Sequence, residues 1–258
     1  MLSIDKYAYN SKIKDTDPLE KLFFAMLTLE VCICADWWVV SIAVLVIMTW
    51  MIVHKSGMSF NNYLKLMLLP GIFLILSLPA VSLGISTDIG RFLLSVPIFH
   101  SHFGISKAGL FLALNLLVKA VAAVSCLYFL ALTTPMVDML TAFRRLKFPE
   151  LLLDLTSLIY RFIFILLETT EAIFTAQNSR LGYINLSSGY RSLSMLVSNL
   201  FIRSYKRAGE LYTALECRGY DGELKVLTEK YPVKWANYMI AVVINLILIF
   251  AILLYKKF

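Results

Sequence analysis

The sequence predicts an all-α integral membrane protein with about five transmembrane helices and a further helical domain outside the bilayer. Three observations lead to this fold class. Hydrophobic residues make up 59% of the 258 positions and charged residues only 16%, which is more apolar than a soluble domain of this size. Several apolar runs approach the roughly 17–25 residues that a helix needs to cross a bilayer. The region 134–234, in contrast, carries charges throughout its length.

Residues 1–20 are predicted to form an N-terminal cytosolic or interfacial arm. The segment mixes Lys with Asp and contains no apolar core, so we do not expect a cleaved signal peptide. The next region, 21–133, is predicted to hold transmembrane helices 1–4.

The first apolar block runs from Leu22 to Val53 and is too long for a single span at about 1.5 Å of rise per residue. Asp36, followed by Trp37 and Trp38, divides the block. Because Trp is enriched at membrane interfaces, we predict a tight helical hairpin whose arms are each near the lower limit of a span.

A polar loop at 54–65 precedes a third span at Leu66–Leu83, which contains Pro70 and Pro79. Prolines in a transmembrane segment predict kinks and do not exclude a helix. The mixed segment 84–106, with Gly, Pro and Ser, is expected to lie at the far surface, partly in the interface. The fourth span is predicted at Ala108–Thr133.

Lys119 lies inside this fourth span and must face other protein or extend toward the interface. We favour a helix-packing role over a transport site. The rival hypothesis is a membrane-embedded enzyme or self-sufficient permease that uses Lys119, Glu30 and Asp36 as a polar path. It requires polar groups converging from several spans, and the sequence offers few.

The region 134–234 is predicted to be a cytosolic helical domain, and 235–258 the final transmembrane helix. Apolar residues recur at three- and four-residue spacing, which is typical of an amphipathic helix: Leu151, Leu152, Leu155, Ile159, Phe162, Ile163 and Leu166. Most of the 24 Lys and Arg residues fall on the arm, the 54–65 loop and 134–234. The positive-inside rule therefore places all three in the cytosol.

No catalytic or metal-binding residue is predicted. His100 and His102 form an HSH triplet that suits a transition metal, but a pair of interfacial polar side chains is the simpler interpretation. A phosphate-binding loop of the G-x-x-x-x-G-K-[ST] kind is absent from the sequence, so any ATP is expected to bind a partner. The four cysteines show neither metal-binding nor redox spacing: Cys32, Cys34, Cys126 and Cys217. Cys32 and Cys34 are interpreted as small apolar fillers.

Two similar signatures end helices in the cytosolic region. In RAGELYTALECRGYDG (207–222), Ala214 lies four residues before Arg218, and Gly219 is predicted as the helix C-cap. In EAIFTAQNSRLGY (171–183) the arrangement recurs in a second set of residues: Ala176, Arg180 and Gly182.

These residue types suit a helix end that fills a groove. Ala permits close approach, Arg offers a planar fork of donors, and Gly ends the helix abruptly. Two such ends predict two grooves, and hence a dimeric or pseudo-dimeric partner. The alternative is a pair of ordinary solvated helix ends whose cations favour the helix dipole.

The opening MLSIDKYAYNSKIKDTDPLEKLFFA, the paired signatures and the RGYDG ending resemble the transmembrane component of energy-coupling factor transporters, cobalt-type (CbiQ/EcfT family). The resemblance covers essentially the whole chain. It implies that the long cytosolic helices are coupling helices, each docking into a groove of one subunit of an ABC-type ATPase dimer. Arg180 and Arg218 would dock, with Ala176, Gly182, Ala214 and Gly219 in support. Leu181 stands where the family signature has Gly, which weakens the match at the first end.

The resemblance implies a non-catalytic coupling subunit in the inner (plasma) membrane that transmits ATP-driven motion to a substrate-binding membrane permease. Cobalt ions are the favoured substrate. Nickel or vitamin transport by the same kind of subunit, and a self-sufficient permease, remain as alternatives. No cofactor is expected on this chain, since ATP and Mg would be bound by the partner ATPase. Nucleic acid is not an expected partner.

Overall fold

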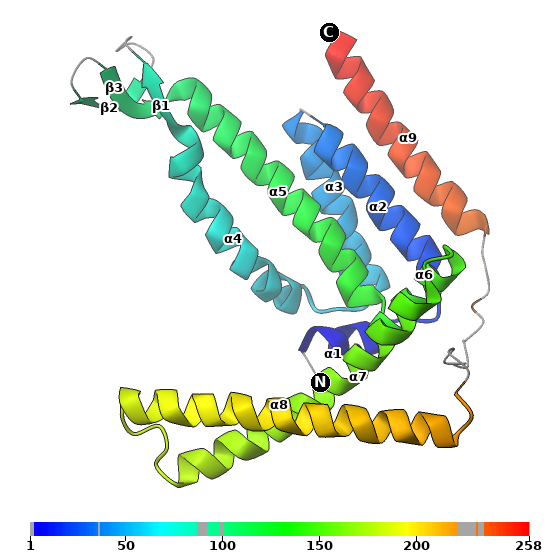
Figure 1. Cartoon of the computed structure of the whole chain (residues 1–258). Coiled ribbons are helices and arrows are strands. Elements are labelled where there is room, and N and C mark those ends of the chain that lie inside the picture. The colour runs from blue at the N-terminus through cyan, green and yellow to red at the C-terminus, as the bar shows by residue number, and fades with distance from the viewer. Residues whose placement is uncertain are drawn as a thin grey trace. The chain divides into compact units, whose positions relative to one another are not determined.

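The computed structural model describes residues 3–35, 37–86, 92–98, 101–220, 231 and 235–257. The chain divides into two compact units, one made of residues 2–139 with 230–258 and the other mainly of residues 140–229. Figure 1 labels the helices and strands, whose bounds are α1 Ser3–Tyr9, α2 Pro18–Cys34, α3 Trp38–Trp50, η1 Met51–Lys55, α4 Phe60–Ser82, β1 Leu83–Ser86, β2 Phe92–Ile98, β3 Ser101–Ser106, α5 Lys107–Thr133, α6 Met136–Arg145, α7 Glu150–Ser179, α8 Leu186–Cys217 and α9 Trp235–Lys257.

The helical hairpin predicted at the first apolar block is confirmed. α2 begins where the Asp17 carboxylate accepts a hydrogen bond from the Leu19 amide at 3.1 Å, with Pro18 in the first turn, a favourable helix start. It ends at Cys34, and α3 starts at Trp38 after a short break. Asp36 itself lies outside the described residues.

Among the described residues, four helical segments are long and apolar enough to cross a membrane: Trp38–Lys55, Phe60–Ser82, Gly109–Thr133 and Trp235–Leu254. α2 belongs to the same unit but has only 17 residues. It is therefore not among these four segments, and four of the five predicted spans are found among the described residues. α4 runs through Pro70 and Pro79 without ending, which agrees with the sequence prediction.

The segment between α4 and α5 contains strands that the all-α prediction did not include. Its described residues form a three-stranded antiparallel sheet in the order β1-β3-β2. Short apolar segments interrupted by Gly and Pro are too brief for a helix but can satisfy their backbone groups by pairing. His102 belongs to β3, whereas His100, and with it the HSH triplet, lies outside the described residues.

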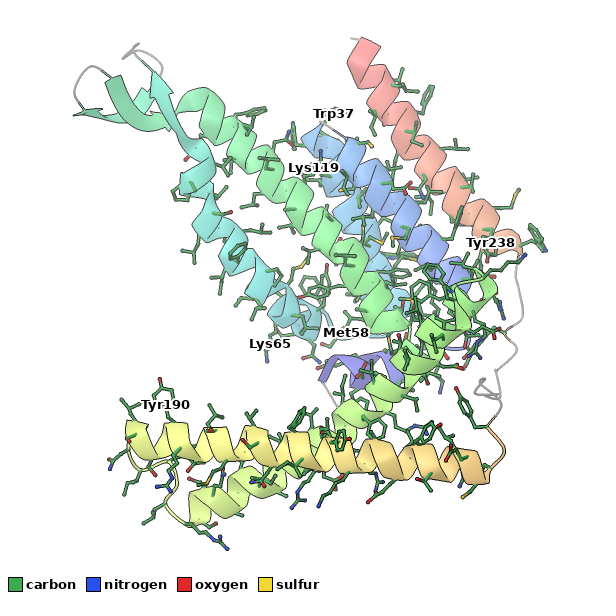
Figure 2. The ribbon with its side chains drawn as sticks, in the orientation of Figure 1. Trp37, Met58, Lys65, Lys119, Tyr190 and Tyr238 are labelled. Carbon is green, nitrogen blue, oxygen red and sulfur yellow. The ribbon has the colours of Figure 1, made fainter. Side chains whose placement is uncertain are left out.

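Polar contacts join α9 to α2 within the membrane unit. The Asn245 side-chain amide donates to Thr28 Oγ1 at 3.2 Å and to the Ala241 carbonyl, and Asn237 donates to Glu20 at 2.7 Å. Such hydrogen bonds, together with small residues, fix helix pairs in a bilayer, where no hydrophobic force acts between helices. Tyr238, labelled in Figure 2, adds a ring contact with Phe23 at 5.8 Å.

A buried lysine holds the end of α5 against the start of α2. Lys21 is 5% exposed, and its Nζ donates to the backbone carbonyls of Thr133 at 3.0 Å and Lys14 at 3.2 Å. Thr133 is the last residue of α5, where helix carbonyls lack partners and a cation is favourable. This contact fixes the point at which the chain leaves α5 for α6.

The second unit consists chiefly of α7 and α8, with 30 and 32 residues. Both are amphipathic, and large apolar side chains remain exposed along α8: Tyr190, Leu193, Val197, Phe201 and Tyr205. These positions follow three- and four-residue spacing on one helix face. The unit thus presents an apolar stripe that its own residues leave uncovered.

Candidate functional site

The two signature arginines occupy the same position at the ends of two helices. Arg180 is the C-cap of α7 with φ −97° and ψ 16°, and Arg218 is the C-cap of α8 with φ −93° and ψ 5°. Both side chains are exposed. Each guanidinium therefore stands at a helix C-terminus, where a cation is favoured by the partial negative charge of the last carbonyls.

The backbone after each arginine follows one hydrogen-bonding pattern. At the end of α7 the Gly182 amide donates to the Gln177 carbonyl at 2.9 Å and the Leu181 amide to the Asn178 carbonyl at 3.0 Å. These paired bonds, six-to-one and five-to-two, define a Schellman motif, which requires a left-handed residue directly after the cap.

The end of α8 repeats both bonds. The Tyr220 amide donates to the Leu215 carbonyl and the Gly219 amide to the Glu216 carbonyl, both at 3.0 Å. Gly219, expected from the sequence to be the cap itself, lies one residue beyond the cap with φ 73°. A Cβ at this position would meet nothing within 4 Å, so the requirement for Gly is conformational.

Leu181, and not Gly182, is the structural counterpart of Gly219. It has φ 61°, a backbone region that costs an L-residue with a side chain about 1–2 kcal/mol. Its side chain is 66% exposed. The replacement of Gly by Leu in this signature therefore preserves the shape of the helix end and adds an exposed apolar group beside Arg180.

Gly182 has a different role, which is to let the chain turn closely from α7 into α8. A Cβ here would lie 2.7 Å from Ser192 Oγ and 2.8 Å from the Gln177 carbonyl oxygen. Ser188 and Ser192 both donate to the Gly182 carbonyl, at 2.9 and 2.8 Å. Any larger residue would displace these groups.

The side chain of Gln177 joins the two sides of this turn. Its Nε2 donates to the Ser192 carbonyl at 2.9 Å, and its Oε1 accepts from the Tyr183 hydroxyl at 2.7 Å. The ring of Tyr183 also packs against that of Phe174 at a tilt of 41°, with ring centroids 4.9 Å apart. The end that bears Arg180 is consequently held by a network of side chains, in addition to its backbone bonds. Sequence reasoning did not identify Gln177, although an amide inside the signature, three residues before Arg180, was a visible signal.

The two alanines of the signatures are exposed one turn before the arginines. Ala176 lines a shallow hollow of about 420 Å³ between α7 and α8, together with Ala172, Glu168 and Arg203. Ala214 lies near Tyr212, whose pKa is raised above its usual value by a hydrogen bond to Glu216 and by that carboxylate's charge. The small side chains leave the helix surface before each arginine accessible.

The two helix ends are far apart within the second unit. Arg180 precedes the turn into α8, while Arg218 caps its opposite end, as Figure 1 shows. A helix of 32 residues spans about 48 Å at 1.5 Å per residue. One partner surface would need two well-separated grooves to hold both ends.

Neither arginine forms an ion pair with any residue that the structure describes, whereas Arg207, on the same helix as Arg218, lies 3.6 Å from Glu210. The signature guanidiniums are thus available for an external acceptor. Arginine suits that task because its planar fork matches carboxylates and backbone carbonyls.

A third helix end of the same kind precedes α7. At the end of α6 the Phe148 amide donates to the Phe143 carbonyl and the Lys147 amide to the Arg144 carbonyl, with Lys147 at φ 60°. Phe143 and Phe148 pack with ring centroids 5.2 Å apart, the apolar contact that usually accompanies this motif. Sequence analysis did not identify this end, although Pro149 directly after it was a signal for a helix boundary.

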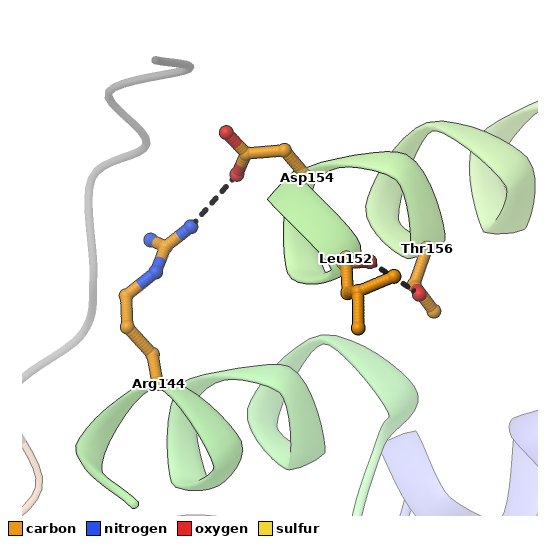
Figure 3. A network of polar contacts seen from close by, with 4 residues as sticks. All are labelled: Arg144, Leu152, Asp154 and Thr156. Atoms are coloured by element: carbon orange, nitrogen blue, oxygen red, sulfur yellow. Dashed lines mark hydrogen bonds and ion pairs between the residues drawn. The ribbon is translucent and has the colours of Figure 1, made fainter. Parts of the chain in front are cut away.

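The turn from α6 into α7 is fastened by an ion pair, drawn in Figure 3. Arg144 Nη2 lies 3.0 Å from Asp154 Oδ1, and the Asp154 side chain is only 9% exposed. Thr156 Oγ1 donates to the Leu152 carbonyl at 2.6 Å within α7. A pair with one partner largely buried constrains geometry more than an exposed surface pair does. It therefore fixes the direction in which α7 leaves the turn.

No ion pair joins Lys119 and Glu30, the two residues of the rival polar path that the structure describes, and Asp36 lies outside the described residues. Lys119 lies half-buried on α5, and its backbone carbonyl accepts a weak bond from Cys32 Sγ of α2 at 3.8 Å. Glu30 is exposed on α2. No cluster of three or more His, Cys, Asp or Glu side chains that could hold a metal ion occurs in the described part of the chain.

Comparison with known families gives a match over most of the chain. The family model described as "CbiQ: Cobalt transport protein" matches residues 9–229. The match includes α2 to α8 and both arginine signatures.

The chain is also similar in sequence to individual proteins. The chain is 33% identical to an uncharacterized protein of Methanocaldococcus jannaschii, over 87% of this chain and 82% of that protein. It is 27% identical to the cobalt transport protein CbiQ of Salmonella typhimurium, over 86% of this chain and 99% of that protein. It is also 37% identical to the energy-coupling factor transporter transmembrane protein EcfT of Bacillus selenitireducens, over 46% of this chain and 48% of that protein.

Proposed function

Because the chain belongs to the CbiQ family of cobalt transport proteins, we propose that it is the transmembrane coupling subunit of an energy-coupling factor importer. The observation that carries the proposal is the pair of matched helix ends. Arg180 and Arg218 both cap helices that close with the same hydrogen-bonding pattern. Each end would fill a groove on one subunit of an ABC-type ATPase dimer.

The separation of the two ends supports a dimeric partner. The 32 residues of α8 separate the two arginines by about 48 Å. This distance is too great for a single groove to hold both of them. Two equivalent grooves, one on each ATPase subunit, fit two equivalent helix ends. Closure of the dimer on ATP would move the grooves and carry the helix ends with them. α7 and α8 would then transmit the displacement as stiff levers.

A second partner is a substrate-binding membrane permease. The proposal of a second partner is supported by the exposed apolar stripe of α8, which a second protein could cover: Tyr190, Leu193, Val197, Phe201 and Tyr205. Large exposed apolar patches mark interaction sites. ATP and Mg would be bound by the ATPase and the transported ion by the permease, so this chain would be a non-catalytic subunit.

Cobalt is the favoured substrate because the family description names it. Nickel is the next candidate, and a vitamin is a further one, because the chain is also similar to energy-coupling factor transmembrane proteins. The coupling role is the same for each of these substrates.

The experiment that tests the proposal is substrate uptake by cells that express the complete transporter with Arg218→Glu in this chain. Charge reversal would place a carboxylate against a groove that accepts a guanidinium, so uptake should fall at least tenfold while the chain remains in the membrane. Arg161→Glu, at an exposed arginine in the middle of α7, is the matched control and should retain uptake. Unchanged uptake by Arg218→Glu would contradict the proposal.

A further inference from the structure

The membrane unit contains an apolar groove at the end of the bundle where α3 passes through η1 into α4. Its volume is about 510 Å³, and its walls come from three helices that qualify as spans: Leu45, Val46 and Trp50 on α3, Leu64 and Met67 on α4, and Val121 on α5. This size lies within the range of small-molecule sites, roughly 300–1,000 Å³. The groove belongs entirely to the first unit.

Three polar side chains also reach the groove. Thr49 Oγ1 donates to the Tyr63 hydroxyl at 3.4 Å, and Tyr63 is only 3% exposed. His54 lies at the groove end, with its ring 5.9 Å from that of Trp50. The interior is otherwise apolar, so its occupant must be mostly hydrocarbon.

Lysines adjoin lining residues in the sequence at this end of the groove, which we call the rim. Lys55 and Lys65 are both exposed and directly follow the lining residues His54 and Leu64. Lys12 lies across the same turn, since its amide donates to the Ser56 carbonyl at 3.0 Å and its side chain covers Gly57. Residues 37–86 include neither Asp nor Glu. Positive charge at this rim is therefore not neutralised by acidic residues of the helices that build it.

The local backbone is also unusual at this point. The last turn of the α3 span, Met51–Lys55, is a π-helix, a rare conformation that occurs frequently at functional sites. It contributes His54 to the groove and Lys55 to the rim. Figure 2 shows Lys65 and Met58 at this end of the bundle and Trp37 at the opposite end.

We infer that the groove binds an anionic phospholipid, with an acyl chain along α3, α4 and α5 and the phosphate at Lys55 and Lys65. Charge complementarity selects this occupant, because an apolar groove with unneutralised lysines at its rim matches a lipid that has an apolar acyl chain and a negatively charged head group. Basic pockets between transmembrane helices recognise such head groups. A helix of a partner membrane protein would fill the apolar walls but would leave the lysines without a counter-charge.

The inference is tested by fluorescence quenching in vesicles. Trp37, Trp38 and Trp235 are replaced by Phe, so that Trp50, which lines the groove, is the single fluorophore. Brominated-chain phosphatidylglycerol is then titrated into phosphatidylcholine vesicles and compared with brominated phosphatidylcholine. The anionic lipid should reach half-maximal quenching at a mole fraction at least threefold lower. Equal quenching by the two lipids would overturn the inference.

Two pairs of variants separate the chain site from the head-group site. Val46→Phe, at a lining residue that is 60% exposed, should reduce quenching by phosphatidylglycerol at least twofold, whereas Ile72→Phe, at a 50% exposed residue of α4 outside the groove, should not. Lys55→Gln with Lys65→Gln should abolish the preference for the anionic lipid. Lys206→Gln with Arg207→Gln removes the same charge from α8 and should leave the preference intact.

The rival occupant gives a distinct result. If the groove is instead a docking site for a helix of the partner permease, adding that subunit should shield Trp50 from both brominated lipids equally. Such shielding would overturn the lipid assignment. Continued quenching by phosphatidylglycerol in the assembled transporter supports it. None of these variants alters Arg180 or Arg218, so failure here leaves the proposed coupling role untouched.

Discussion

At the scale of single residues, a leucine takes the backbone conformation at the end of α7 that glycine takes at the end of α8. Leu181 has φ 61° and Gly219 has φ 73°, and each directly follows an arginine cap. The backbone bonds and the side-chain network of Gln177 hold Leu181 in place despite the strain of this region. At the end of α8 the conformation is unstrained because the residue is Gly.

Substitution at these two positions should therefore have opposite effects. Gly219→Ala should cost about 1 kcal/mol and speed amide exchange at Tyr220 roughly fivefold, because a Cβ disfavours positive φ. Leu181→Gly should slow exchange at Gly182, by a smaller factor since Gly also adds entropy to the open state. Hydrogen exchange read by mass spectrometry measures both, and equal exchange in the variants and the original protein would contradict this account.

At the scale of elements, more side-chain bonds among the described residues hold the corner between α7 and α8 than hold the C-terminal end of α8. The fixed geometry of the corner comes from Gln177, Tyr183 and the two serines that donate to the Gly182 carbonyl. A stiff corner can transmit a displacement applied at Arg180 to both helices. The end at Arg218 relies, among the described residues, on its backbone bonds alone.

Gln177→Leu should loosen this corner. It removes the bond from Gln177 Nε2 to the Ser192 carbonyl and leaves the Tyr183 hydroxyl without its acceptor, a loss of about 1–3 kcal/mol. Exchange of amides in residues 180–190 should accelerate about tenfold, and uptake by the complete transporter should fall. Asn178→Leu, at the exposed neighbouring amide, is the matched control. If both variants exchange alike, the side chain of Gln177 does not stabilise the corner.

The membrane helices are joined by polar contacts at the element scale as well. Asn245 on α9 reaches Thr28 on α2, and Lys21 on α2 reaches the last carbonyl of α5. These contacts connect helices that are separated by more than 100 residues in the sequence. The final helix is consequently part of the same compact unit as the first ones.

At the scale of the whole molecule, the chain combines a membrane unit with a unit that exposes much of its apolar surface. Tyr190, Phe201 and Tyr205 on α8 are 72%, 72% and 77% exposed. A unit of this kind is expected to function with its apolar face covered by other proteins or by lipid. The proposed complex supplies such cover, with the ATPase dimer at the helix ends and the permease along α8.

The complex should be recoverable in mild detergent. The tagged chain is expected to co-purify with an ABC-type ATPase and a second membrane subunit, identified by mass spectrometry. The double variant Arg180→Glu with Arg218→Glu should lose the ATPase but retain the membrane subunit, because only the helix ends are changed. Arg161→Glu with Arg191→Glu, which alters charge equally on α7 and α8, should retain both. Recovery of the ATPase with the first variant would argue against docking through the arginines.

The sequence by itself determined the membrane character, the helical hairpin at Trp37 and the positions of the two arginine signatures. These features depend on local composition and spacing: an apolar run must be buried, Trp is enriched at the membrane interface, and Arg is favourable at a helix C-terminus wherever the helix packs. The resemblance carried by the same residues agreed with the family match over 9–229.

Only the tertiary structure decided the equivalence of Leu181 with Gly219, the role of Gly182 and Gln177 in the corner, the sheet between α4 and α5, and the groove beside η1. Sequence preferences do not place leucine at positive φ, so only the backbone bonds in the structure reveal that Leu181 takes this conformation. The sheet pairs β1 with β3 and the groove joins α3 to α5, which are contacts between distant segments. Such contacts arise from packing among elements, and the spacing of residues along one chain segment does not encode them.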